Sequence, residues 1–265
     1  MTASAEAILE SLDDWWALAG IEVPPRPRLQ AAPSVNAPKP APVFRAQAKA
    51  ATPIADAVSM AKAAAAACTS LDELEAAVRA FDGCSLKAQA RNTVFMDGVR
   101  GARVMVIGEA PGKEEDEQGR PFVGASGQLL DRMLASIGLN RSANVAITNI
   151  IPWRPPGNRN PTATETAICL PFVRRHIEIT QPDCLLLVGA VATQALLDSK
   201  DGIMKMRKAN HRLTLPNLTK PIDTFVLLHP AFLLRRPQDK HLAWADLLRV
   251  EKQILLQGVA LEPHF

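Results

Sequence analysis

Four short apolar runs, each followed by a segment with helical spacing, constrain the fold of this chain more than any other feature. Apolar strands that alternate with helices are typical of a parallel sheet covered on both faces. We therefore predict an α/β domain of three layers, α/β/α, with a central four-stranded parallel sheet. The strands are expected at residues 103–107, 144–149, 184–188 and 224–228.

Polar residues and glycines follow directly after these strands. Gly108 and Glu109 come after the first strand, Asn149 ends the second, Gly189 follows the third and His229 follows the fourth. In an open parallel sheet the ligand crevice lies outside the carboxyl ends of the strands. We therefore expect these residues to converge on one cleft.

The N-terminal part of the chain differs in composition from the rest. Residues 1–22 place apolar and acidic side chains at helical spacing and predict a short helix. Residues 23–53 are rich in proline and alanine and predict a flexible linker. The catalytic domain is expected over residues 54–265, beginning with a helix at 54–67 and a second one capped by Ser70.

Net charge and cysteine content indicate in which compartment, and with which partners, the protein is expected to act. The formal net charge is only +3, so attraction to nucleic acid would need local clusters of Arg and Lys. No stretch of about eighteen consecutive apolar residues and no basic leader are present. Cys68, Cys84, Cys169 and Cys184 form no tightly spaced pairs, which favours reduced, buried thiols. We predict a cytoplasmic monomer without membrane contact.

The first segment with candidate functional residues is GEAPGKEEDEQGRPFVGASGQLL, from Gly108 to Leu130. Its glycines allow sharp turns, and Gly124 with Gly127 brings a helix N-terminus close to an anion. A nucleotide-binding loop or a plain strand-to-helix turn is the alternative, although the segment lacks the glycine patterns of a P-loop and of a dinucleotide-binding loop. Phe122 in this loop is either a platform for a planar ligand or part of the core.

The second loop, TNIIPWRPPGNRNPTATE, begins at the strand that Asn149 ends. A side-chain amide offers a donor and an acceptor together, matching the N3 and O4 edge of uracil, whereas cytosine would place donor against donor. The alternative for Asn149 is a turn cap. Arg154 and Arg159 are candidates for phosphate contacts or for solvated surface positions.

The third segment is LLHPAFLLRRPQDKHLAWADL, in which His229 precedes a proline. This segment combines apolar side chains such as Leu233 with basic side chains such as Arg235. The apolar ones would act as a wedge and the basic ones would bind phosphates, which together would hold a duplex open after a base is extruded. A structural histidine and a core helix with a charged outer face are the alternatives.

Taken together, GEAPG-x2-ED, PFVG, TN, RPPGNR and HPA-x-LLR in this order resemble the uracil-DNA glycosylase superfamily, most closely its family 4 enzymes. The resemblance spans residues 83–250. It implies a monofunctional glycosylase that flips uracil out of single- or double-stranded DNA and hydrolyses the N-glycosidic bond, which initiates base excision repair.

The resemblance also implies roles for individual residues. Phe122 would stack on the flipped base and Asn149 would read its edge, and Gly108 and Ala110 are further candidates for binding the substrate. The carboxylates of Glu109 and Glu115 are candidates for positioning the attacking water. His229 would donate to uracil O2, where charge accumulates as the bond breaks. By their own chemistry Arg154 and Arg159 are the candidates for binding backbone phosphates, and Leu233 and Arg235 are competing candidates for the residue that intercalates into DNA.

The chain departs from the family at its iron-sulfur cluster. Family 4 members usually hold a 4Fe-4S cluster with four cysteines, whereas two of those positions are Phe81 and Trp153 here, leaving only Cys84 and Cys169. Phenylalanine and tryptophan cannot ligate iron and are large enough to fill the space. We expect no metal and no cofactor, with a persisting cluster as the alternative.

Two other functions remain open on the sequence. A broader glycosylase would also accept deaminated purines such as hypoxanthine or xanthine, because pocket volume cannot be read from sequence. A catalytically weak module would bind uracil or abasic DNA without turnover. The retained Glu109, Asn149 and His229 favour turnover.

Overall fold

The four predicted parallel strands form the centre of a larger sheet. The computed structural model describes residues 54–261, and the predictions for residues 1–22 and 23–53 lie outside that range. The described sheet has six strands in the order β1-β3-β2-β4-β6-β5. They span Met96–Gly98 (β1), Val104–Gly108 (β2), Val145–Asn149 (β3), Cys184–Val188 (β4), His211–Leu213 (β5) and Ile222–Leu227 (β6).

The two edge strands were not predicted. β1 pairs with β3 and β5 pairs with β6, both antiparallel, whereas the four central strands β3, β2, β4 and β6 are parallel to one another. Each edge strand has only three residues, and most of them are partly exposed. Such segments carry neither a continuous apolar run nor a clear alternation, so the sequence contains no strand signal there.

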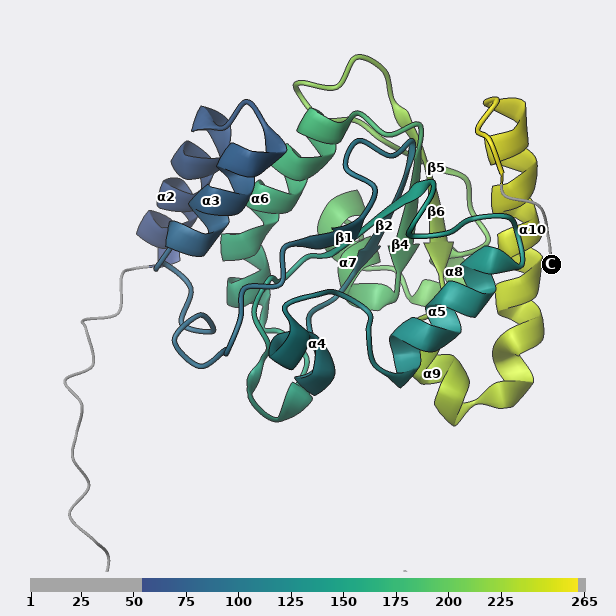
Figure 1. Ribbon diagram of the computed structural model, residues 1–265, viewed down its shortest axis with the longest axis horizontal. Helices are drawn as coiled ribbons and strands as arrows, with labels where there is room; N and C mark the ends of the chain where they lie inside the picture. The colour runs from purple at the N-terminus through teal and green to yellow at the C-terminus, as the bar shows by residue number, and fades with distance from the viewer. Residues whose placement is uncertain (1–53, 262–265) are drawn as a thin grey trace, which may run out of the picture. The chain divides into compact units, whose positions relative to one another are not determined.

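Helices cover both faces of the sheet (Figure 1). One layer holds α2 (Ile54–Ala67), α3 (Leu71–Ala80), α6 (Ala163–Thr180) and α7 (Ala190–Leu197). The other holds α5 (Ala125–Ala135), α9 (Pro230–Arg235) and α10 (Lys240–Leu256). The short helices α4 (Lys113–Gln118) and α8 (Ile203–Met206) and the 3-10 turns η1 (Pro156–Asn158) and η2 (Pro237–Asp239) lie in the connections.

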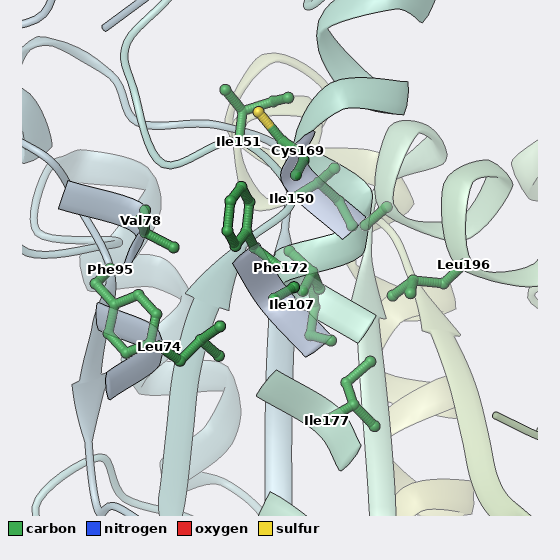
Figure 2. Close-up of a cluster of buried hydrophobic side chains, with 14 of the residues drawn as sticks. Leu74, Val78, Phe95, Ile107, Ile150, Ile151, Cys169, Phe172, Ile177 and Leu196 are labelled. Atoms are coloured by element: carbon green, nitrogen blue, oxygen red, sulfur yellow. The ribbon is translucent and has the colours of Figure 1, made fainter. Parts of the chain in front are cut away.

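Alternation along the strands divides the core in two. Met105 and Ile107 of β2 pack toward the layer of α6, whereas Val104 and Val106 pack toward α5 and α10. All four side chains are fully buried, and burial of each stabilises the fold by about 1.5–3 kcal/mol. Figure 2 shows the first cluster, in which Ile107 lies close to side chains from several helices.

Local signals in the sequence agree with two of the helix starts. Ser70 caps α3, since its hydroxyl accepts from the Glu73 N–H at 3.2 Å, as predicted. At α6 the hydroxyl of Thr162 and the carboxylate of Glu165 form a complete capping box. Among residues 54–261, no helix is long and apolar enough to cross a membrane.

The register of the central strands sets the position of the functional loops. Gly108 of β2 pairs with Asn149 of β3, and Val188 of β4 pairs with Leu227 of β6. The four parallel strands therefore end along one edge of the sheet. The loops that follow them meet there, which is the arrangement expected for a ligand crevice.

Candidate functional site

A cavity of about 530 Å³ opens where the parallel strands end. This volume lies within the range of about 300–1,000 Å³ that is typical of small-ligand sites. Eight of the residues predicted for the site line it: Glu109, Ala110, Glu115, Phe122, Asn149, Arg159, His229 and Arg235. Their convergence from separate loops places the predicted cleft at this edge of the sheet.

Gly108 lies between two of these side chains. A methyl group at its Cα would overlap the ring of Phe122 and would lie 2.5 Å from Asn149 Oδ1. Glycine therefore lets the aromatic ring and the amide approach the same piece of backbone. Gly108 does not line the cavity itself, and it acts by leaving room for the two residues that do.

The loop that carries Phe122 is held by backbone contacts. Phe122 has a φ of +54°, a left-handed conformation that is uncommon for a large side chain. Its carbonyl accepts from Arg141 Nη2 at 2.7 Å, and the carbonyl of Pro121 accepts from Nη1 at 3.1 Å. Gly127 of α5 packs against the Phe122 carbonyl so closely that a Cβ would overlap it. These contacts fix the ring, whose centroid lies 5.9 Å from that of His229.

The Asn149 side chain lines the cavity with an unpaired polar atom. The residue is 4% exposed, and its Oδ1 is buried without a hydrogen-bond partner among the described residues. Leaving such an acceptor unpaired costs about 1–3 kcal/mol. A ligand that supplies an N–H donor at this point would recover that energy.

His229 caps the helix that follows it. Its Nδ1 accepts from the Ala231 N–H at 3.1 Å, so the proton of the neutral ring resides on Nε2. Burial, together with the positive charge of Arg235, lowers the pKa of His229 to about 4, although Glu115 acts in the opposite direction. The imidazole is therefore neutral near pH 7 and can donate one hydrogen bond from Nε2.

The two acidic candidates differ in their surroundings. Both oxygens of Glu115 are occupied: Oε2 accepts from the Gly112 N–H at 3.0 Å, and Oε1 accepts from the N–H groups of Val123 and Gly124 at 2.9 Å. Glu115 therefore ties the start of α4 to the segment after Phe122.

Glu109, by contrast, forms no side-chain hydrogen bond or ion pair with any described residue. It is partly buried in the cavity, and this burial raises the pKa of its carboxyl above the usual value. A carboxylate with free oxygens can bind water, so Glu109 is better placed for that task than Glu115.

The two arginines of the second loop have protein partners. Arg159 donates two hydrogen bonds to Glu165, at 2.9 and 2.6 Å, and this pairing helps to hold the pKa of Glu165 at about 2. Arg154 donates from Nε to Asn158 Oδ1 at 2.7 Å and does not line the cavity. Arg159 therefore also orders the loop that forms the cavity wall.

Leu233 lies too deep in the core to be the apolar side chain that enters DNA as a wedge. Leu233 is 1% exposed and belongs to the core between the sheet, α5 and α10. Its neighbour Leu234 is 41% exposed, and Arg235 is exposed and lines the cavity. Position 233 points inward because it follows the buried Pro230 by three residues on α9, so both lie on the inner face. A side chain buried to this degree cannot enter DNA, and we withdraw Leu233 as the wedge.

Sequence reasoning missed Arg141. Its guanidinium joins the carbonyls of the Phe122 loop to Asp97 of β1, which it contacts at 2.7 Å, and to Asp131 of α5. Arg141 lies nineteen residues from Phe122, in a connection without a recognisable motif. No signal in the sequence could have assigned it to the site.

The residues at the expected cluster positions form part of the core. Phe81, Cys84, Trp153 and Cys169 are 6%, 2%, 1% and 0% exposed and belong to the same apolar cluster. Phe81 packs edge-on against Phe172 with centroids 5.1 Å apart. The neighbouring Cys84 thiol and burial together raise the pKa of the Cys169 thiol well above its usual value. Figure 2 shows Cys169 beside Ile151.

This donor set does not fit a four-iron cluster. Such a cluster needs four thiolates, and only two converge here. Cys184 lies in the other core cluster, across the sheet, and the Cys68 thiol donates to the carbonyl of Ala64 within α2. In residues 54–261, no three His, Cys, Asp or Glu side chains are grouped so that they could hold a metal ion.

Fold and cavity together define an α/β protein that presents an aromatic ring, an amide, an imidazole and a carboxylate at the carboxyl ends of a parallel sheet. The chain belongs to the uracil DNA glycosylase superfamily, whose family model matches residues 95–248. This match confirms the family predicted from the motifs, and with it the enzyme class and the α/β fold.

Curated relatives agree with the family match. A type-4 uracil-DNA glycosylase of Thermotoga maritima is 39% identical over 184 residues, which are 68% of this chain and 93% of that protein. A type-4 uracil-DNA glycosylase of Pyrobaculum aerophilum is 36% identical over 173 residues, 63% of this chain and 86% of that protein. A type-5 uracil-DNA glycosylase of the same organism is 36% identical over 110 residues, which cover 36% of this chain and 48% of that protein.

Proposed function

We propose that this protein removes uracil from DNA as a monofunctional glycosylase and so initiates base excision repair. The observation that carries the proposal is the buried, unpaired amide oxygen of Asn149 at the end of β3, which approaches the same backbone position, Gly108, as the ring of Phe122. In this proposal uracil lies against Phe122, and its N3–H donates to Asn149 Oδ1. The amide N–H of Asn149 then donates to O4, which cytosine would replace with a second donor.

His229 and Glu109 would act on the breaking bond. As the glycosidic bond lengthens, the sugar gains positive charge and uracil gains negative charge at O2. The neutral imidazole donates its Nε2–H to O2, since Nδ1 is already an acceptor in the α9 cap. The carboxylate of Glu109 stabilises the cationic sugar and orients the water that attacks it.

The exposure of Lys113, the lysine that lines the cavity, favours hydrolysis in a single step over attack by an amine. Lys113 is exposed, and its Nζ lies 3.9 Å from Glu117. A lysine that acts as a nucleophile normally lies in a desolvated pocket, whereas Lys113 is exposed. Water directed by Glu109 is then the nucleophile, and an abasic site is the product.

DNA contacts are assigned to the rim of the cavity. Arg235 is exposed and forms no ion pair with the described residues, so it is free to bind a phosphate next to the flipped nucleotide. Leu234, rather than Leu233, is the exposed apolar side chain of α9 that would support the opened strand. Arg154 and Arg159 would add charge near the strand while they order the second loop.

Replacing Asn149 with Asp tests the assignment of base recognition. The carboxylate cannot donate to O4 and repels it, so release of uracil should fall by about a hundredfold, or roughly 3 kcal/mol. Uracil release is measured under single turnover on single- and double-stranded oligonucleotides. Asn210→Asp, the same change at an exposed position outside the cavity, should retain full activity.

The same assay separates the two alternatives. Oligonucleotides with hypoxanthine or xanthine are tested in parallel, and release of these bases at rates like that of uracil would establish a broader glycosylase. Tight binding of uracil DNA without release of the free base would establish a binding module. Either result contradicts the proposed uracil-specific activity.

We further propose that the enzyme works without a cofactor. Phe81 and Trp153 supply apolar contacts where the family's cluster would need thiolates, and Trp153 also donates from Nε1 to Thr93 Oγ1 at 3.0 Å. The purified protein is expected to be colourless, to contain no stoichiometric iron and to retain activity after treatment with a chelator. A brown protein with four irons per chain would overturn this proposal.

A further inference from the structure

A second hollow, of about 200 Å³, lies between α5, α9 and α10. The two hollows share elements, since the first turn of α5 and several residues of α9 line the base cavity, whereas Arg132 of α5 and Leu233 of α9 line the second. α10 begins directly after η2, at the end of the domain where α9 lies (Figure 1). A strand bound at the base cavity therefore has a short path to this hollow.

The side chains at the second hollow carry positive charge and one aromatic ring. Arg132 and Lys240 are exposed and form no ion pair with any described residue, and no carboxylate of the described residues lines the hollow. Trp244 is 47% exposed and lies one turn after Lys240 on α10. Residues four apart share a helix face, so the indole and the ammonium group lie on the same side.

This combination fits a nucleic-acid strand better than a small molecule. The hollow is smaller than the range of about 300–1,000 Å³ in which small ligands are usually enclosed. An exposed ring next to cations matches the way proteins bind single strands, in which bases stack on aromatic side chains while Arg and Lys contact phosphates. Arg235 of α9 continues the positive charge toward the base cavity.

We propose that Arg132, Lys240 and Trp244 form a flank site, which binds the DNA strand on one side of the flipped nucleotide. One base next to the lesion stacks on Trp244, and Arg132 and Lys240 bind the phosphates beside it. The inference rests on the proposed function, because the strand enters this site from the base cavity.

Single-stranded oligonucleotides extended on one side of the uracil test the flank site. One set carries about ten nucleotides 5′ of the uracil and another carries them 3′, a length within the range that single-strand-binding folds cover. Trp244→Ala should raise KM about tenfold for one of the two sets and leave kcat unchanged for both. Trp244→Phe, which keeps an aromatic ring, should restore most of the affinity.

Salt dependence tests the two cations together. Each cation that binds a phosphate of a single strand adds about 0.7 to the slope of log K against log salt, so the double variant Arg132→Gln, Lys240→Gln should reduce the slope by about 1.4. Leu256→Ala serves as a control, because this 74% exposed residue lies at the far end of the same helix. It should change neither KM nor the salt slope.

Binding of uracil-free strands distinguishes failure of this inference from failure of the proposed function. If Trp244→Ala weakens that binding about tenfold, the flank site stands even where no uracil is released. A second outcome is that the wild-type chain releases uracil, while the Trp244→Ala variant, shown by thermal unfolding to be folded, changes neither KM nor binding. That outcome overturns the flank site and leaves this face to a protein partner. Equal effects on both oligonucleotide sets, or a fall in kcat, would also overturn it.

Discussion

Glu109→Gln is expected to lower single-turnover release of uracil by about a thousandfold, within the range of about 10²–10⁴ for a positioned acid or base. The amide keeps the shape of the side chain but loses the negative charge that faces the cationic sugar. It also cannot take the proton of the attacking water. Substrate binding should change little, so the loss should lie in the rate constant measured with saturating enzyme.

The pH dependence of the reaction gives a second measurement on Glu109. Only the ionised carboxylate is active, so the rate of the native enzyme should fall as the pH drops through the pKa of Glu109. Burial raises that pKa above 4.5, so the fall begins at a higher pH than it would for an exposed glutamate. This acid limb should be absent in Glu109→Gln.

A control with the same chemical change is available on α4. Glu117 is exposed and does not line the cavity, so Glu117→Gln should leave both the rate and its pH profile unchanged. Retention of more than a tenth of the native rate in Glu109→Gln would show that this carboxylate does not direct the water.

His229→Ala is expected to slow uracil release by about a hundredfold to a thousandfold, the usual loss when one donor to a developing oxyanion is removed. The neutral ring donates from Nε2, and alanine leaves the charge on uracil O2 without that donor. His229→Gln places an amide N–H near the position of Nε2 and should recover part of the rate. Single-turnover kinetics with saturating enzyme measure all three proteins.

The pKa of about 4 for His229 also predicts how the rate depends on pH. A histidine with an ordinary pKa near 6.5 would titrate between pH 5 and 8, whereas His229 should stay neutral over that range. No change in rate should therefore follow its titration between pH 6 and pH 8. Equal rates for His229→Ala and the native enzyme would exclude His229 from the reaction.

The centre of the sheet was predictable because its strands are buried on both faces. The strand β4, for example, is apolar throughout and fully buried, so its composition alone marks it. The antiparallel edge strands depend on pairing with a neighbour rather than on their own composition. His211–Leu213 forms a strand because it pairs with β6, which no local pattern reveals.

The site was predictable where a residue acts through its own chemistry. Phe122 supplies an aromatic ring from a loop, Asn149 and His229 supply an amide and an imidazole at or just after strand ends, and all three line one cavity. The different roles of Glu109 and Glu115 were not predictable, because they depend on which carboxylate accepts hydrogen bonds from the loop. Glu115 does so, through Gly112, Val123 and Gly124, and only coordinates reveal this.

The hydrogen bonds around Phe122 have a consequence for how the enzyme could change its substrate. Arg141, Glu115 and Gly127 each contact the backbone of Phe122 or of its neighbour Val123, so three separate contacts hold this piece of the cavity wall. The entropy of ordering this wall is lost during folding, so binding of the base does not have to supply it. A rigid wall cannot widen for a purine by a loop movement. Acceptance of larger bases would instead require substitutions at the opposite wall, while the Phe122 side stays constant.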